Sequence, residues 1–494
     1  MRGPKVSVLG FDNSYRRLPE RFYAPVTPAS VSAPRLIAFN RQLASDLGLD
    51  PQSLEAQAAS LFSGNSLAPD AEPIALAYAG HQFGNFVPQL GDGRALLLGE
   101  VVDPKGRRFD IQLKGSGPTP FSRRGDGRAA LGPVLREYLV SEAMHAMGIP
   151  TTRSLAAVTT GESVYREDIL PGAVLTRVAA SHIRIGTFQY FAARRDTDAI
   201  RILVDHAIER HAPEIAGAER PALALLETVI SRQAFLVARW MHVGFIHGVM
   251  NTDNMTVSGE TIDYGPCAFL DEYDPAKVFS SIDHGGRYAF ANQPAIAQWN
   301  LARLAETLLP LISDDTQAAI AMATEAIEAF PQQFENFWQQ GMRAKLGLSQ
   351  EQAGDAELVE ELLDVMHRSK ADHTLTFRRL TDAAEDSSAL PEVRKLFRSP
   401  ADFDTWAARW QERLQHDPQS VSGRASAMRA VNPVYIPRNH QVERAIRAAI
   451  GGDFSVFETL HRLLQHPFEV QAGMAGFEEP PQPEERVLQT FCGT

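Results

Sequence analysis

The chain has 494 residues, 44% of them hydrophobic, and a formal net charge of −12. At roughly 100–200 residues per domain, this length corresponds to about two to four domains or to one large bilobal unit. The composition is that of an ordinary globular protein and excludes collagen-like and broadly disordered chains. The acidic balance disfavours nucleic-acid partners, so any anionic ligand needs a local basic pocket.

The sequence also limits the compartment. No apolar run approaches the ~20 residues that span a bilayer, and residues 1–30 lack the apolar core of a secretory signal. We therefore expect a cytoplasmic protein without a membrane partner. Cys267 and Cys492 form neither a zinc motif nor a disulfide framework, which favours a reducing compartment. The sequence leaves open whether they pair; a monomer is expected, although no pattern determines the oligomeric state.

The two ends of the chain look irregular. The first 70 residues are rich in proline and carry two predicted short helices. One helix is predicted from a cap at Ser32, with Pro34 in its first turn, to a stop before Gly48. At the other end, an acidic and proline-rich tail around residues 478–485 is expected to be loosely held up to Cys492.

A strand-rich region follows a glycine-rich loop at residues 78–86. Strands are predicted at 95–102, an apolar run, and at 107–114, where hydrophobic and polar residues alternate. A type I turn at 103–106 joins them into a hairpin that ends at Lys114. A helix from about 132 to 147, with Glu137 beside its buried stripe, and strands at 155–160, 163–165 and 173–178 are expected next.

The chain then becomes mostly helical. A long helix from about Pro221 to Val243 ends at Gly244 and is followed by His247-Gly-Val-Met-Asn-Thr-Asp-Asn254. A small hairpin at residues 256–262 leads into Asp263-Tyr-Gly265. Successive helices are expected from beyond Trp299 to about Gln465.

The order of these parts is that of a kinase-like ATP site: strand lysine, helix glutamate, catalytic loop, metal aspartate. Lys114 would neutralise phosphate charge and pair with Glu137, while Asn254 and Asp263 would offer hard oxygen ligands to Mg²⁺. The alternatives are a solvated Lys114–Glu137 ion pair and a purely structural turn at Asp263.

This order predicts the fold class and the domain boundaries. We expect an α+β, protein-kinase-like bilobal fold with a β-rich N-lobe, a mostly helical C-lobe and extensions at both ends. The predicted boundaries are 1–75 for the N-terminal extension, 76–180 for the N-lobe, 181–400 for the C-lobe with its catalytic loop and metal aspartate, and 401–494 for the helical C-terminal extension and tail.

The catalytic loop departs from the kinase pattern. In kinases, the aspartate that acts as the catalytic base lies two residues after the histidine. This chain has Val249 there, which cannot accept a proton. By that rule the protein is a pseudokinase. Asp253 offers a displaced carboxylate that could replace the missing base if it points into the site; otherwise it caps or braces the loop.

Arginines and glycine turns complete the set. Arg177 and Arg184 could bind phosphate oxygens through their forked guanidinium groups, although surface arginines are an equal alternative from spacing alone. The turns at Gly91-Asp-Gly-Arg94 and Asp126-Gly127 are places where backbone can approach a nucleotide.

Six motifs stand out along the chain: Gly80-His-Gln-Phe-Gly84, Gln89-Leu-Gly-Asp-Gly-Arg94, Leu113-Lys-Gly115, Gly125-Asp-Gly-Arg128, His247-Gly-Val-Met-Asn-Thr-Asp-Asn-Met255 and Asp263-Tyr-Gly-Pro266. Together they resemble the selenoprotein O family of pseudokinase-like protein nucleotidyltransferases. The resemblance covers essentially the whole chain, including Asn432-Pro433 and Cys492.

The resemblance implies that ATP binds inverted relative to kinases, so that AMP passes to a hydroxyl of a protein Ser, Thr or Tyr. It implies Asp253 as proton acceptor, Asn254 and Asp263 as ligands of Mg²⁺ or Mn²⁺, and Cys492 as the bacterial counterpart of a selenocysteine. It also implies UMP transfer from UTP to Tyr or His in bacterial members. The implied nucleotide contacts are Gly91, Gly93, Arg94, Lys114, Asp126, Gly127, Arg177, Arg184 and Asp263.

Three functions therefore compete at this stage. The first is a protein adenylyltransferase, the second is a phosphotransferase that binds ATP in the ordinary orientation, and the third is a non-catalytic nucleotide-binding scaffold. The sequence determines neither the protein substrates nor the preference between ATP and UTP.

Overall fold

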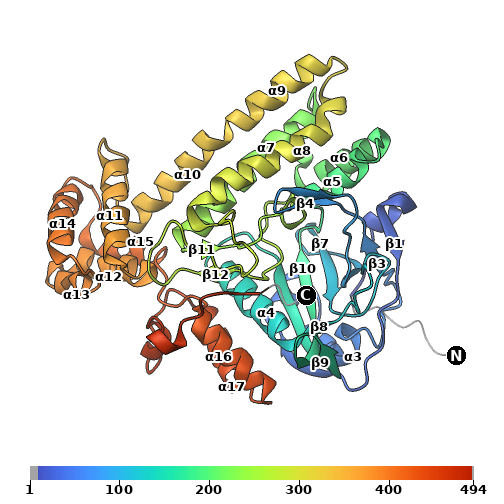
Figure 1. Ribbon diagram of the computed structural model, residues 1–494, viewed down its shortest axis with the longest axis horizontal. Coiled ribbons are helices and arrows are strands. Elements are labelled where there is room, and N and C mark those ends of the chain that lie inside the picture. Colours follow the sequence, from blue (N-terminus) through green and yellow to red (C-terminus); the bar gives the residue numbers. More distant parts are fainter. Residues whose placement is uncertain (1–8, 492–494) are drawn as a thin grey trace.

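The computed structural model describes residues 9–491 and has two lobes (Figure 1). An antiparallel sheet dominates the N-terminal half, and helices dominate the C-terminal half. The α+β, kinase-like bilobal fold predicted from the sequence is thereby confirmed.

One twisted sheet forms the first lobe. It contains strands from both the N-terminal extension and the predicted N-lobe, and β8 (Ala129–Ala130) pairs with β10 beside it. The strand order across the sheet is β1 (Tyr23–Pro25), β3 (Ile74–Leu76), β6 (Ala95–Val102), β7 (Arg108–Lys114), β10 (Ile169–Ala179), β9 (Arg153–Tyr165) and β2 (Arg35–Phe39).

The register of the central strands groups three polar side chains. Arg177 on β10 lies directly opposite Gln112 on β7, and Lys114 follows Gln112 by two residues. Directly paired residues and residues two apart on one strand share a face of the sheet. The face that carries Lys114 therefore also carries Gln112 and Arg177.

Helix α4 (Leu131–Ala146) packs against β9 and β10, as its apolar spacing predicts. Leu135, Leu139 and Ala143 are fully buried in the core. Glu137 lies two residues from both Leu135 and Leu139, and its carboxylate contacts Lys114 at the end of β7. The C-terminal helices α16 (Asn439–Ile450) and α17 (Ser455–Leu464) cover the other side of α4.

The predicted helix at residues 32–48 is wrong in its first half. Residues 35–39 form strand β2, which pairs with β9 at Leu36 and Val158. The helix α1 (Arg41–Asp46) begins only after Asn40, whose side chain accepts a hydrogen bond from the amide of Leu43. Sheet pairing at an edge is a tertiary effect and outweighs the local helix signal. Two further short helices, α2 (Pro51–Glu55) and α3 (Ala58–Phe62), follow.

Three other local predictions differ from the structure. Residues 155–160 and 163–165 belong to one continuous strand, β9. The glycine-rich loop contains a small hairpin of β4 (Gly80–Gln82) and β5 (Asn85–Val87). The hairpin expected at 256–262 is reduced to isolated bridges, one of them between Met255 and Thr261.

The second lobe is built around helix α7 (Pro221–His242), which packs against neighbouring helices. Within residues 9–491 it is the one helix long and apolar enough to cross a membrane, and 56% of its most apolar window is buried. Such burial is what a core helix shows. The other helices are α5 (Ile185–Ala192), α6 (Thr197–His211), α8 (Gln293–Ile312), α9 (Thr316–Glu328), α10 (Phe330–Lys345), α11 (Asp355–Ser369), α12 (His373–Glu385), α13 (Leu390–Arg394), α14 (Pro400–Gln415) and α15 (Val421–Arg429).

Short elements fill the connections. Strands β11 (Phe245–Ile246) and β12 (Ala268–Phe269) pair on either side of the predicted catalytic loop and metal aspartate. Short 3₁₀ helices lie at Tyr15–Arg17, Glu20–Phe22, Pro213–Ile215, Thr252–Asn254, Phe290–Asn292, Ser387–Ala389, Ala475–Phe477 and Pro483–Glu485.

The acidic tail is held more firmly than expected. The amide of Thr490 donates to the carbonyl of Phe279 at 2.8 Å, and its hydroxyl donates to the carbonyl of Pro266 at 2.5 Å. The tail thus docks on the segment that follows Asp263-Tyr-Gly265. Cys267 is buried, whereas Cys492 lies outside the described residues, so their pairing stays open.

Candidate functional site

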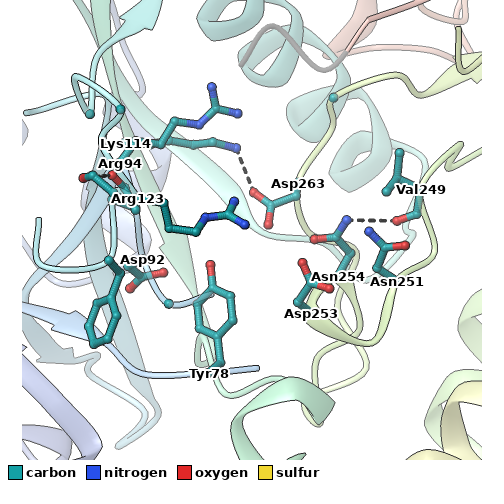
Figure 2. Close-up of a pocket in the computed structure, with 18 of the residues that line it drawn as sticks. Tyr78, Asp92, Arg94, Lys114, Arg123, Val249, Asn251, Asp253, Asn254 and Asp263 are labelled. Atoms are coloured by element: carbon teal, nitrogen blue, oxygen red, sulfur yellow. Dashed lines mark hydrogen bonds and ion pairs between the residues drawn. The ribbon is translucent and has the colours of Figure 1, made fainter. Parts of the chain in front are cut away.

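A cavity of about 580 Å³ contains the residues that the sequence singled out (Figure 2). Its walls come from the glycine-rich loop, the end of β7, the loop before α4, the catalytic loop and the segment at Asp263. Glu137 lies behind the wall, where it contacts Lys114. The predicted residues that line the cavity are Gly91, Gly93, Arg94, Lys114, Asp126, Gly127, Arg177, Arg184, Asp253, Asn254 and Asp263.

Lys114 is held by two carboxylates. Its Nζ atom lies 2.6 Å from Oε2 of Glu137 and 2.7 Å from Oδ1 of Asp263. The side chains of Lys114 and Glu137 are only 12% and 5% exposed. This burial excludes the solvated ion pair that was the alternative interpretation.

Asp263 is the point where three cations meet. Besides Lys114, the guanidinium of Arg177 donates to its Oδ1 at 2.7 Å and that of Arg184 donates to its Oδ2 at 2.6 Å. Burial alone would raise the pKa of the Asp263 carboxyl, but these three positive charges hold it well below its ordinary value. Arg177 and Arg184 are themselves almost completely buried, so they are not surface arginines.

Two buried residues that we did not select from the sequence connect these arginines. Oε1 of Gln112 accepts hydrogen bonds from Nε and Nη2 of Arg177, at 3.1 and 2.5 Å. The side-chain Nε2 of Gln112 donates to Oδ2 of Asp92 at 3.2 Å. Gln112 could have been found from the sequence, because the alternation along β7 places it on the same face as Lys114. For Asp92, the sequence offers no local sign other than its two glycine neighbours.

The catalytic loop presents Asp253 to the cavity, as Figure 2 shows. Val249 lines the same cavity, so the position of the usual base is apolar. Oδ2 of Asp253 accepts from the side chain of Gln82 at 3.3 Å, while its buried Oδ1 has no hydrogen-bond partner. Burial raises the pKa of Asp253 to about 6.

The glycine-rich hairpin docks directly on this loop. The amide of His81 donates to the hydroxyl of Thr252 at 2.6 Å, and the amide of Phe83 donates to Oδ1 of Asn251 at 3.0 Å. A β-carbon on Gly80 would overlap the carboxylate of Asp253. These contacts between segments about 170 residues apart in sequence have no local signature, and the sequence analysis missed them.

Asn254 is oriented for an oxygen ligand role. Its side-chain nitrogen donates to the carbonyl of Val249 at 2.9 Å, which leaves its carbonyl oxygen available. Within residues 9–491, no group of three or more His, Cys, Asp or Glu side chains could hold a metal ion. The oxygens of Asn254 and Asp263 suit Mg²⁺ or Mn²⁺ if substrate oxygens and water complete the coordination, as is usual for Mg²⁺.

The glycine turns lie where backbone must come close. A β-carbon on Gly91 would overlap the ring of Phe121, and one on Gly127 would overlap the backbone of Gly117. Asp126, next to Gly127, forms an ion pair of 2.8 Å with Arg166. Both turns therefore bring main chain to the cavity wall at positions that exclude side chains.

Comparison with known proteins agrees with this geometry. The profile of the family described as "Protein adenylyltransferase SelO" matches residues 5–465. The chain is 62% identical over 489 residues to "Protein nucleotidyltransferase YdiU" of Rhizobium etli strain CIAT 652, covering 99% of this chain and 98% of the relative. It is 65% identical over 486 residues to the protein of that name from Bradyrhizobium sp. strain ORS 278, covering 98% and 99%. The chain belongs to the SelO family of protein nucleotidyltransferases, enzymes that act on proteins with a nucleotide as co-substrate.

Proposed function

We propose that the enzyme transfers AMP from ATP to the hydroxyl groups of Ser, Thr or Tyr in cytoplasmic proteins, and that UTP serves as a second donor for UMP transfer to Tyr or His. The observation that carries this proposal is the convergence of Lys114, Arg177 and Arg184 on Asp263, in the wall of a cavity that Val249 lines at the position of the kinase base. We further propose that the enzyme works as a monomer.

The three cations would bind the β- and γ-phosphates of the nucleotide. Charge develops on pyrophosphate as the bond between the α-phosphorus and the bridging oxygen breaks. Buried cations around that leaving group stabilise the transition state, and each such contact can contribute a few kcal/mol where water is excluded. Gly91, Gly93, Arg94, Asp126 and Gly127 would contact the rest of the nucleotide, at the wall of the cavity.

Asp253 would act as the base. Asp253 lines the cavity and the Oδ1 atom of its carboxylate has no hydrogen-bond partner, so the carboxylate could accept the proton of the acceptor hydroxyl, whose oxygen would then attack the α-phosphorus. Asn254 and Asp263 would hold Mg²⁺ or Mn²⁺, which would neutralise charge on the phosphate oxygens. Glu137 keeps Lys114 in place from behind the cavity.

The decisive experiment follows the phosphate groups. The enzyme is incubated with a protein acceptor, or with itself, and with ATP labelled either at the α- or at the γ-phosphate. We expect protein to carry the α label only, with an added adenylate mass in the mass spectrum. A γ label on protein would establish the phosphotransferase instead, and no label with retained ATP binding would establish the scaffold. The same assay with α-labelled UTP tests the second donor.

A further inference from the structure

Asp92 lies beside Arg184 in the wall of the cavity and is 2% exposed. Its Oδ1 is 3.9 Å from Nη2 of Arg184 and has no hydrogen-bond partner. Its Oδ2 accepts from the amide of Leu76 at 3.1 Å and from the side chain of Gln112. Asp92 is thus fixed by one oxygen and presents the other to the guanidinium.

The guanidinium of Arg184 therefore lies between two carboxylates. It contacts Asp263 at 2.6 Å and Asp92 at 3.9 Å, and its central carbon lies 4.7 Å from the centre of the Tyr78 ring. Figure 2 shows Tyr78 and Asp92 on one side of the cavity and Asp263 on the other. Arg177 is linked to the same network because Gln112 bonds both Arg177 and Asp92.

This arrangement matters because Asp263 has two proposed roles. Without a nucleotide it neutralises Lys114, Arg177 and Arg184; as a metal ligand it must share or lose those contacts. Arg177 would keep Gln112 and Glu137 as partners. Arg184 would keep one hydrogen bond, to the carbonyl of Asp253 at 2.5 Å, and the ring of Tyr78. Its nearest remaining anion is Asp92.

We infer that Asp92 is a positioning residue: it would become the carboxylate partner of the Arg184 guanidinium when Asp263 serves as a metal ligand. Gln112, which bonds both Asp92 and Arg177, would orient Arg177 in the same way. This inference rests on the proposed function, since it assumes that Arg184 binds the leaving phosphates. A planar guanidinium that is anchored on one edge presents its other edge to phosphate in a fixed direction. This orientation matters for catalysis because the reacting groups must be held in the right geometry.

The test compares Asp92→Asn with the parent enzyme. Asparagine retains an acceptor for the amide of Leu76 and removes the charge that faces Arg184. We expect kcat for α-phosphate transfer to fall at least about 10-fold, while KM for the nucleotide does not rise. Because a negative charge is removed beside a phosphate site, calorimetry in a chelator should show metal-free ATP binding at least as tightly as to the parent. A collapsed site would instead bind ATP more weakly.

A second background shows whether Asp92 acts through Arg184. In Arg184→Lys the fork is absent, so adding Asp92→Asn should change kcat less than about 2-fold. Asp355→Asn is the matched control, because Asp355 is also buried and paired with an arginine, Arg413, far from the cavity; it should leave kcat unchanged. If Asp92→Asn does not fold, Gln112→Glu serves instead, since it retains the acceptor for Arg177 and removes the donor to Asp92; it too should lower kcat.

The outcomes separate the two proposals. If the parent enzyme transfers no α label, the proposed function fails. If the parent transfers label and Asp92→Asn has the same kcat as the parent, the positioning role is wrong while the proposed function stands. The same conclusion follows if Asp92→Asn lowers kcat by the same factor in the Arg184→Lys background as in the parent.

Discussion

Gly80 of β4 lies directly against the carboxylate of Asp253 in the catalytic loop. A β-carbon built on Gly80 would overlap Oδ1 of Asp253 and lie 2.9 Å from its Cγ. The backbone of the glycine-rich loop therefore forms one side of the pocket that holds this carboxylate, and any side chain at residue 80 must displace it.

Gly80→Ala should accordingly impair transfer more than stability. We expect the rate to fall about 10-fold or more, because misplacing a reacting group by a fraction of an ångström is costly in catalysis. Gly217→Ala is the control, since a β-carbon there has no heavy atom within 4 Å and the residue has no positive φ. Steady-state kinetics and melting temperatures of both variants provide the measurement; unchanged kinetics for Gly80→Ala would contradict the contact.

Removal of the proposed base gives the second prediction. Asp253→Ala should lower the transfer rate by about 10²–10⁴-fold, which is the usual contribution of a general base. Nucleotide binding should persist, because the three cations remain. Radiolabel transfer and calorimetric ATP binding are measured on the same preparation. A variant with near-parental transfer would show that the acceptor needs no base or that another residue serves.

The third prediction concerns the metal. Asn254→Ala should weaken binding of the metal–nucleotide complex and eliminate turnover, with little effect on binding of ATP in a chelator. The reason is that the amide oxygen of Asn254 is proposed to touch only the ion. ATP binding and turnover are measured at a fixed ATP concentration, in a chelator and during titration with Mg²⁺ or Mn²⁺. Full turnover of the parent enzyme in a chelator would refute the metal site altogether.

Lys345 gives a prediction about stability. Its ammonium is buried and has Asn432 as its hydrogen-bond partner, at 2.9 Å. Burial, with a smaller effect of Arg239, lowers the pKa of Lys345 to about 7 from its ordinary value of 10.5. Between these values the unfolded chain binds the additional proton, so this residue makes the free energy of unfolding rise with pH from about 7 to about 10.5.

Lys345→Met should therefore flatten that part of the pH profile. Urea unfolding of the parent and the variant at several pH values between 6 and 10 gives the difference directly, because other groups cancel. The variant should gain stability relative to the parent toward pH 6 and lose this advantage toward pH 10. Parallel profiles would show that the lysine keeps its ordinary pKa in the folded protein.

The sequence predicted most of the site but not the contacts that hold it. Lys114 was identified because it ends the alternating strand β7, Glu137 because it flanks the apolar stripe of α4, and Asp263 because it opens the Asp-Tyr-Gly motif. Gln112 and Asp92 were missed because their importance depends on the register of β7 against β10, a pairing between segments far apart in the chain. The fold shows the same division: strong local patterns such as α4 and α7 were predicted closely, whereas β2 was missed because it pairs with the distant strand β9.

The contact between Thr490 and the segment at Pro266 has a consequence for biosynthesis. At about 5–20 residues per second, a ribosome needs on the order of a minute to make this chain, and every residue lining the cavity emerges before the tail. The carbonyls of Pro266 and Phe279 therefore gain the two donors of Thr490 only after the whole cavity-lining part of the chain has been made. A nascent chain that stalls before Thr490 would have every residue of the cavity and still lack the hydrogen bond from Thr490 to Pro266 in its wall.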